Sequence, residues 1–389
     1  MKHTRTIMTA ALLAAGCWFW SAGPAGGDSV AAAARGQVES RRPVDLVICL
    51  DTSGSMNGLI ESAKQKLWAV VNELATAKPR PRLRVALYQY GNDGLARENG
   101  WVERICDLTD DLDTVYGKLF ALRTNGGTEY VARVVRAAVG ELDWSKESNA
   151  LRVIFVAGNE PATQDKEFPL KDTCAAAAGK GIVINTIHCG DEETGRRTGW
   201  ADAALWADGR YAAIDQDHGT VIINTPYDQQ LSELSRQVND TYVPYGPAGA
   251  GGGANQAAQD ANAATLGVAA EAQRAAGKST TLYSNSGWDL VDASREASFD
   301  LAKVEEEHLP AEMRGMTLEQ RKAHLEAQAK RRDGIRKQIQ ELSEKRQAFA
   351  KKEMERQGLS EEKSFDAALR TAVRQQAESK GFEFEKGTN

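Results

Sequence analysis

Residues 43–245 alternate between two hydrophobic periodicities, and this alternation limits the fold more than any other feature of the chain. Continuous apolar runs such as VDLVICL (44–50) and LRVIFVAG (151–158) predict strands that are buried on both faces. Between them, apolar residues such as Leu59 and Ala63 recur at helical spacing. Strands that alternate with crossover helices predict an α/β domain with a doubly wound, mostly parallel sheet.

The other elements of this domain follow from the same patterns. We expect further strands at 83–90, 101–108, 181–190 and 209–215. The strand at 101–108 follows a short Gly- and Asn-rich turn, so we expect it to pair antiparallel with the strand before it. We expect helices at 58–75, 112–122, 130–142 and 226–242, of which the last is amphipathic and closes the domain.

The chain after residue 245 has a different character. Residues 246–265 are dominated by Gly, Ala and Asn, and we expect a flexible linker there. Residues 266–389 are expected to be mostly helical, with a helical hairpin or coiled coil over 318–380. The apolar positions at heptad-like spacing are Leu318, Leu325, Ile335, Ile339, Leu342 and Phe349, and Arg332 interrupts one of them. A solvated charged helix without a partner is the alternative.

The N-terminus has the pattern of an export signal. Basic residues precede an apolar core from Ile7 to Trp20, and small residues follow it. This pattern predicts a signal peptide over residues 1–26 and export to the periplasm, the cell envelope or the medium. The apolar run is shorter than the ~20 residues that a spanning helix needs. Acylation at Cys17, which would attach the chain to a membrane, is an alternative.

Charge and cysteine content limit the partners and the redox chemistry. The chain carries 48 Lys and Arg against 54 Asp and Glu, a formal net charge of -6. Nucleic acid is therefore not expected as a partner, because phosphate binding needs a basic face. The sequence does not fix how Cys49, Cys106, Cys174 and Cys189 might pair. Cys49 lies inside an apolar run and is expected in the core.

The first predicted strand ends in the hexapeptide DTSGSM, residues 51–56. Ligands of a parallel sheet gather at the carboxyl ends of its strands, where Asp51, Ser53 and Ser55 would present one carboxylate and two hydroxyls. Oxygen ligands of this kind suit Mg²⁺, with Mn²⁺ or Ca²⁺ as alternatives, rather than zinc. The alternative is that these side chains only cap the following helix.

Three segments together resemble the loops of a von Willebrand factor type A domain. They are DTSGSM, NGGTEY (125–130) and VIFVAGNEP (153–161), and ADGRYAAID resembles the closing segment of that family. The resemblance spans residues 43–245 and implies a metal-ion-dependent adhesion site. It implies that Ser53 and Ser55 bind the metal directly, that Asp51 acts through water or through these hydroxyls, and that Thr128 is a further ligand.

The third loop departs from the pattern of this family. Gly158 stands where the family usually carries Asp, and Asn159 would offer a neutral carbonyl oxygen in its place. Glu160 would offer a carboxylate if the loop shifted. One negative charge fewer weakens a site for a divalent cation. For Thr128 the alternative is that its hydroxyl caps the following helix.

The resemblance implies a binding module rather than an enzyme. An acidic side chain of a protein ligand would complete the coordination of the metal. A hydrolase would need Asp51 or Ser53 as nucleophile, yet the GxSxG motif is absent and the domain contains only His188 and His218 as bases. We therefore predict no catalysis. A third hypothesis is a cell-envelope scaffold that acts, or self-associates, through its C-terminal helices.

Overall fold

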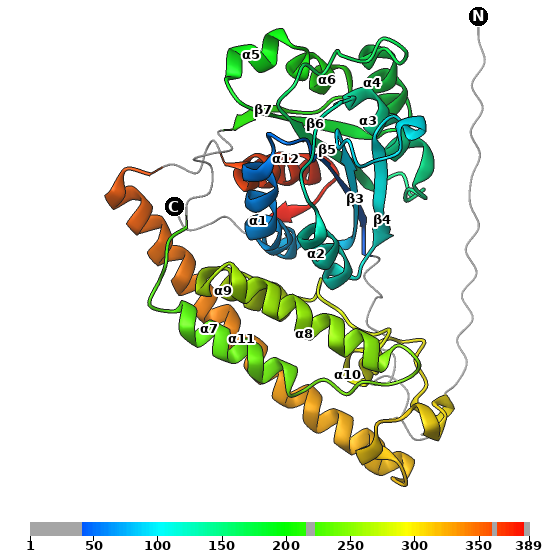
Figure 1. Ribbon diagram of the computed structural model, residues 1–389. Coiled ribbons are helices and arrows are strands. Elements are labelled where there is room, and N and C mark those ends of the chain that lie inside the picture. The colour runs from blue at the N-terminus through cyan, green and yellow to red at the C-terminus, as the bar shows by residue number, and fades with distance from the viewer. Residues whose placement is uncertain (1–40, 215–221, 360–363, 385–389) are drawn as a thin grey trace, which may run out of the picture. The chain divides into compact units, whose positions relative to one another are not determined.

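The structure, a computed structural model, describes residues 41–214, 222–359 and 364–384 (Figure 1). The predicted signal peptide, Cys17 and His218 lie outside these residues. Among the helices of the described ranges, none combines the length and the apolar character that crossing a membrane requires. Cys49, Cys106, Cys174 and Cys189 carry free thiols, and Cys49 lies in the core as predicted.

A six-stranded sheet in the order β4-β3-β1-β5-β6-β7 forms the centre of the sheet domain. The strands are β1 (Pro43–Asp51), β3 (Arg82–Tyr90), β4 (Val102–Thr109), β5 (Leu151–Gly158), β6 (Val183–Cys189) and β7 (Tyr211–Ile214). β4 lies at one edge and pairs antiparallel with β3, whereas the other neighbours pair in parallel. The doubly wound α/β sheet and its antiparallel edge strand are therefore confirmed.

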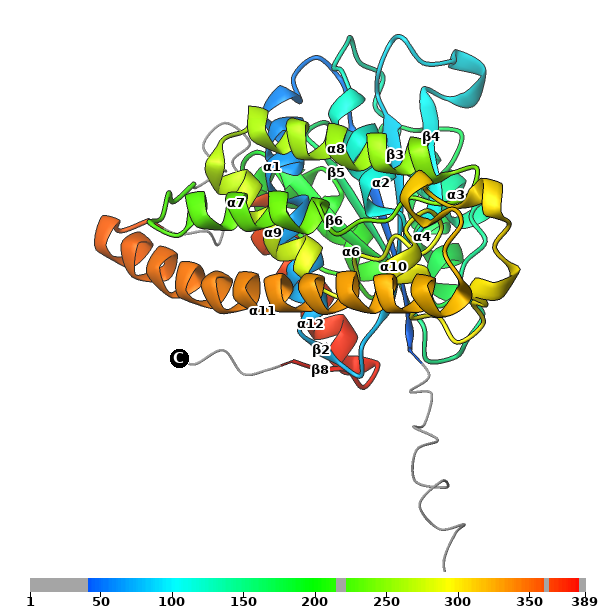
Figure 2. The ribbon, with the colours of Figure 1, turned by 90° about the horizontal axis from the view of Figure 1, so that it is seen from below.

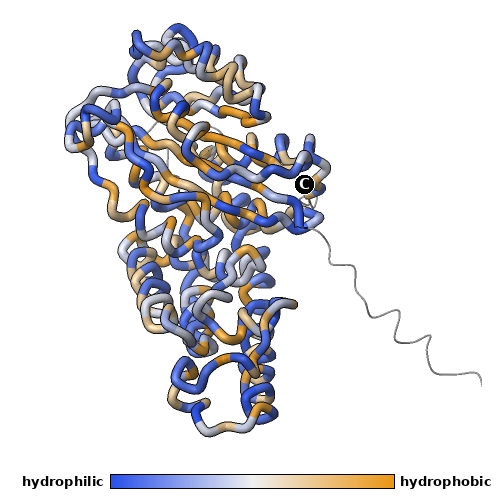
Figure 3. Tube along the Cα trace, turned by 90° about the vertical axis from the view of Figure 1, so that its right-hand side faces the viewer, coloured by the Kyte–Doolittle hydropathy of each residue, from blue (hydrophilic) through white to orange (hydrophobic). Residues whose placement is uncertain are grey.

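Helices cover both faces of the sheet because its central strands are apolar on both sides. The covering helices of the first part of the chain are α1 (Asn57–Ala75), α2 (Leu112–Ala121), α3 (Val131–Glu141), α4 (Leu170–Gly179), α5 (Glu192–Arg197) and α6 (Trp200–Trp206). α1 and α2 share a core with Leu46 and Ile48 of β1, and α3, α4 and α6 share the opposite core with Val47 and Cys49. Figure 3 shows hydrophobic residues along the strands between these layers.

The helix beside α1 comes from the far end of the chain. α12 (Phe365–Ser379) buries Phe365, Leu369 and Val373 in the core that α1 and the sheet share. The Arg374 guanidinium lies 3.0 Å from the Glu73 carboxylate of α1. Beyond α12, β8 (Glu383–Phe384) pairs with β2 (Ala77–Lys78). The C-terminal segment is therefore part of the sheet domain.

The helix expected to close the domain is formed but lies elsewhere. α7 (Asp228–Asn239) packs mainly with α9 (Val268–Ser279) and α11 (Leu318–Gln357), through Leu231, Leu234 and other buried residues. α12 occupies the place beside α1 instead. The sequence pattern identified an amphipathic helix but not the surface that its apolar side contacts.

Residues 246–265 are not a flexible linker. They form α8 (Gly249–Thr265), which packs against α2 and α9. A Cβ atom on Gly252 would collide with the indole ring of Trp288, so the missing side chain permits this close contact. The Gly- and Ala-rich composition reflects close packing of a helix rather than flexibility.

The expected hairpin over 318–380 is also wrong, because α12 leaves α11 and packs on the sheet domain. α11 is a single helix of 40 residues that runs alongside α7 and α9 and contacts α10 (Leu290–Ala293) (Figure 2). Its buried residues are Leu325, Arg332, Ile335, Arg336 and Ile339. Short 3-10 helices lie at η1 (Arg97–Asn99), η2 (Leu301–Lys303), η3 (Glu306–His308) and η4 (Ala311–Met313).

Candidate functional site

The DTSGSM loop leaves β1 at its carboxyl end and leads into α1. Asp51 is fully buried, and its Oδ1 accepts a hydrogen bond from the backbone N–H of Ser53 at 2.8 Å. The buried Oδ2 of Asp51 has no hydrogen-bond partner among the described residues. The Oγ atoms of Ser53 and Ser55 lie 3.4 Å apart. The loop thus brings the predicted oxygen donors together and leaves one carboxylate oxygen for a further ligand.

Helix capping does not account for these side chains. Met56 is the N-cap residue of α1, and among the described residues this helix has no side-chain capping hydrogen bond. Tyr130 is the N-cap residue of α3, again without a side-chain cap. The capping interpretations of DTSGSM and of Thr128 are therefore wrong.

Backbone hydrogen bonds tie the second predicted loop to the first. The N–H of Gly54 donates to the carbonyl of Gly126 at 2.6 Å, and the N–H of Asn125 donates to the carbonyl of Thr52 at 3.0 Å. Gly126 has a φ of 54°, in the left-handed region that favours glycine. Thr128 follows in this loop and is half-buried, and within the described ranges its hydroxyl makes no hydrogen bond to Ser53 or Ser55.

The third loop contacts the first through Asn159. Its Nδ2 lies 3.0 Å from the Oγ of Ser55, and its Oδ1 is buried without a partner in the described chain. The amide would have to rotate for its oxygen to face a cation with Ser55. A Cβ atom on Gly158 would collide with the Tyr90 hydroxyl and would lie 3.0 Å from Asp51 Oδ2. The structure therefore has no room for a side chain at the position where the family usually carries Asp.

Sequence reasoning missed Glu129, which the structure places at the same site. A Cβ atom on Gly91 would lie 2.8 Å from both Asp51 Oδ1 and Glu129 Cγ, so the two acidic side chains flank one point. Glu129 Oε1 also lies near Ser53, because a Cβ atom on Gly127 would collide with this oxygen and would lie 3.1 Å from Ser53 Cβ. The signal that could have revealed Glu129 is an acidic residue directly after the Gly-Gly-Thr of the second loop.

Burial controls the ionisation of these carboxyl groups. It is the largest of the effects that together raise the pKa of Asp51 to about 7. The charges of Glu129 and Glu160 also raise this pKa, and the hydrogen bond from the Ser53 backbone N–H lowers it. Burial also raises the pKa of Glu129, and the neighbouring charges of Glu160 and Asp93 add to this effect. No Lys or Arg in the described ranges forms an ion pair with Asp51, Glu129 or Glu160. A cation would favour the ionised form of each group.

The geometry agrees with a comparison against known families. A family model described as von Willebrand factor type A domain matches residues 45–198. Residues 45–198 form a von Willebrand factor type A domain. The resemblance inferred from the three loops is therefore confirmed for the family. Domains of this family commonly mediate protein binding or adhesion and are typically not enzymes.

Solved structures with type A domains show low sequence identity to this chain. Proximal thread matrix protein 1 from the mussel byssus, with a zinc-occupied MIDAS motif, is 13% identical, with a TM-score of 0.37 over 46% of this chain and 43% of that one. The SpRpn10 VWA domain is 16% identical, with a TM-score of 0.35, and the match covers 44% of this chain and 87% of that domain. The pilus adhesin SpaC from Lactobacillus rhamnosus GG is 14% identical, with a TM-score of 0.34, and the match covers 46% of this chain and 28% of the adhesin.

The chain matches less than half the length of the byssus protein. No curated protein matches it.

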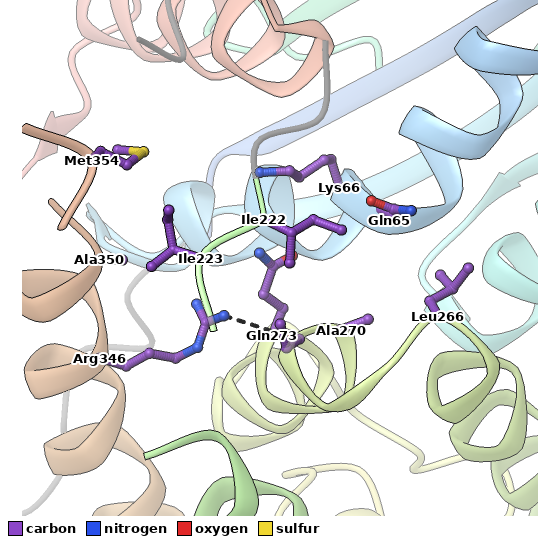
Figure 4. Close-up of a pocket in the computed structure, with 11 residues that line it drawn as sticks. Gln65, Lys66, Ile222, Ile223, Leu266, Ala270, Gln273, Arg346, Ala350 and Met354 are labelled. Carbon is purple, nitrogen blue, oxygen red and sulfur yellow. Dashed lines mark hydrogen bonds between the residues drawn. The ribbon is translucent and has the colours of Figure 1, made fainter. Parts of the chain in front are cut away.

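A pocket of about 60 Å³ lies between α1, α9 and α11 and shares no residue with the three loops of the type A domain (Figure 4). Ile222 lines it together with the basic side chains of Lys66 and Arg346. The Nε of Arg346 donates to Asp228 at 2.7 Å, and the Nζ of Lys66 lies 3.7 Å from Asp366. These basic groups form ion pairs between helices, and we assign no function to the pocket.

Proposed function

We propose that this chain is an exported binding module whose type A domain recognises a protein ligand through a divalent cation. The proposal is carried by the buried carboxylate of Asp51, whose Oδ2 has no partner in the described chain and lies beside the hydroxyl-bearing loop. Carboxylate and hydroxyl oxygens suit Mg²⁺, with Mn²⁺ or Ca²⁺ as alternatives. When bound, the cation would supply the positive charge that attracts an acidic side chain of the ligand.

Residues from all three loops would bind the cation. Asp51, Ser53 and Ser55 would hold the cation, and Thr128 and Asn159 would be further ligands. The contacts of Asp51, Ser53, Ser55 and Asn159 with one another support this set. The neighbouring loop surface would select the protein ligand by shape and charge.

The remaining parts of the proposal rest on the sequence. The pattern of residues 1–26 supports export to the periplasm, the cell envelope or the medium. Acylation at Cys17 and self-association through the C-terminal helices stay predictions.

Calorimetric titration of the full chain without its predicted signal peptide tests the cation site. MgCl₂, MnCl₂ and CaCl₂ are titrated into the wild type, into Ser53→Ala and into Ser298→Ala. We expect saturable heat from the wild type and an affinity at least about tenfold lower in Ser53→Ala, because a ligand oxygen is lost. Ser298 is exposed and far along the chain, so its variant is expected to match the wild type. No saturable heat from the wild type with any of the three salts would refute the proposal.

A further inference from the structure

The third loop supplies no aspartate to the proposed cation site. The Tyr90 hydroxyl donates to the carbonyl of Ala157 at 3.0 Å and fills the space in which a side chain of Gly158 would begin. Asp51 would then be the one carboxylate among the predicted ligands, and a divalent cation would keep much of its charge unbalanced. A tight site needs a second carboxylate from another part of the domain.

Glu129 is placed to supply that carboxylate. A Cβ atom on Gly127 would collide with Glu129 Oε1 and would lie 3.1 Å from Ser53 Cβ, so this oxygen lies next to the Ser53 side chain. On the other side, Glu129 Cγ and Asp51 Oδ1 lie at the same distance, 2.8 Å, from the Cβ position of Gly91. The Glu129 side chain therefore lies beside both Asp51 and Ser53 of the DTSGSM motif.

The unpartnered oxygen of Asp51, which also carries the proposed function, indicates that a ligand belongs beside this carboxylate group. Asp51 is fully buried and its Oδ2 is unpartnered within the described residues, although burial of a carboxylate oxygen without a partner is costly. We propose that Glu129 is the second carboxylate ligand of the cation and takes the part that the third loop commonly gives to an aspartate in this family. This assignment rests on the cation-dependent function proposed above.

Glu160 is the competing candidate, and its position is less suitable. It is exposed, and its backbone carbonyl accepts a hydrogen bond from the Trp200 indole at 2.8 Å, which fixes the loop that carries it. Its effect on Asp51 and Glu129 is that of a nearby charge. Glu129, by contrast, is half-buried, and its side chain lies beside Asp51 and Ser53.

Calorimetric titration of Mn²⁺ into variants of the same chain, again without its predicted signal peptide, decides between Glu129 and Glu160. Glu129→Gln keeps the size of the side chain and removes one ligand charge, so we expect an affinity at least about tenfold lower than that of the wild type. Glu129→Asp keeps the charge but shortens the side chain and so moves the carboxylate away from the site. We expect its Mn²⁺ affinity to lie between that of the wild type and that of Glu129→Gln. Glu160→Gln and Glu312→Gln make the same change in net charge, and Glu312 is an exposed residue of η4. We expect the Mn²⁺ affinity of each of these two variants to stay within about twofold of the wild type.

The outcomes separate this assignment from the function on which it rests. If the wild type binds Mn²⁺ and Glu129→Gln binds equally well, the assignment is wrong while the proposed cation site stands. If Glu160→Gln loses affinity instead, the second carboxylate is Glu160. If the wild type gives no saturable heat, both proposals fail. A thermal melt of each variant shows whether it is folded, and Glu129→Asp replaces Glu129→Gln in the comparison if the latter unfolds.

Discussion

At the carboxyl edge of the sheet, the Tyr90 hydroxyl occupies the space in which a side chain of residue 158 would begin, and only glycine fits there without a shift of Tyr90. Tyr90 is fully buried at the end of β3, and its hydroxyl reaches across to the carbonyl that precedes Gly158. A family motif that reads Asp at this position could not be built here without moving Tyr90. The departure in the third loop therefore accompanies a close packing contact, and in the proposed cation site it would remove one ligand charge.

Gly158→Ala is expected to destabilise the fold by about 1–3 kcal/mol, because its Cβ would overlap the Tyr90 hydroxyl in a packed core. Removing that hydroxyl by Tyr90→Phe in the same chain should recover most of the loss, although the hydrogen bond to Ala157 is lost as well. Urea unfolding measures these free energies. Gly140→Ala is the matched control, because nothing lies within 4 Å of a Cβ at this helical position. Equal stability of Gly158→Ala and wild type would contradict the packing argument.

At the scale of elements, a buried ion cluster fixes α11 to α10 and its N-cap residue. Arg332 is fully buried, and its Nη1 lies 2.6 Å from Asp289 Oδ2 and 2.9 Å from Asp292 Oδ1. Its Nε donates to the Thr241 hydroxyl at 2.9 Å, and its guanidinium lies over the Tyr242 ring. The cation that interrupts the apolar heptad positions of α11 is thus the partner of the acidic residues in the sequence GWDLVDA.

Arg332→Met tests this cluster. The apolar side chain would leave the fully buried Asp289 carboxylate without a cation and Asp292 with only Arg336, at 3.8 Å, so we expect a loss of about 3–5 kcal/mol in the free energy of unfolding. The neighbouring Arg331 is half-exposed and pairs with the exposed Asp240 at 3.4 Å, so Arg331→Met should cost no more than about 1 kcal/mol. Equal losses in the two variants, measured by denaturant unfolding, would show that the buried cluster adds no stability.

The strands and helices of the sheet domain could be predicted because their periodicity is local. The proximity of Asp51, Ser53 and Ser55 could be predicted because these three oxygen-bearing residues follow a strand end within five positions of the sequence. α8 was missed because Gly lowers helix propensity in isolation, whereas here it permits contact with Trp288. Glu129 was missed because its place beside Asp51 and Ser53 depends on the approach of two loops, which the acidic residue after Gly-Gly-Thr does not reveal by itself.

At the scale of the whole described chain, the helices after β7 and the sheet domain form continuous packing rather than separate parts. Arg274 of α9 donates to Asp113 of α2 at 2.7 Å and to Asp260 of α8 at 2.5 Å, in a buried position. Tyr283 donates to the same Asp113 carboxylate. α12 then returns to cover α1 and the sheet. A boundary at residue 245 therefore does not separate two independent domains.

This continuity predicts that the last helix is needed for the fold of the first part of the chain. A chain that ends at Gly358 lacks α12 and β8 and leaves apolar core residues such as Leu50 and Leu67 without the cover of Phe365 and Leu369. Each large side chain contributes about 1.5–3 kcal/mol by burial, so the loss should be on the order of 5 kcal/mol or more. Because a typical domain is stable by only about 5–15 kcal/mol, we expect a much lower melting temperature and binding of a hydrophobic dye.

A peptide of residues 364–384 distinguishes the loss of this helix from a general effect of truncation. Added to the shortened chain, the peptide should raise the melting temperature in proportion to its concentration, because it binds the folded form. The same peptide with Leu369→Asp should fail, since it would place a charge at a fully buried position. Removal of residues 385–389 alone is the length control and should leave the melting temperature unchanged. If the chain that ends at Gly358 melts like the full chain, α12 is an accessory to the type A domain and not a part of its core.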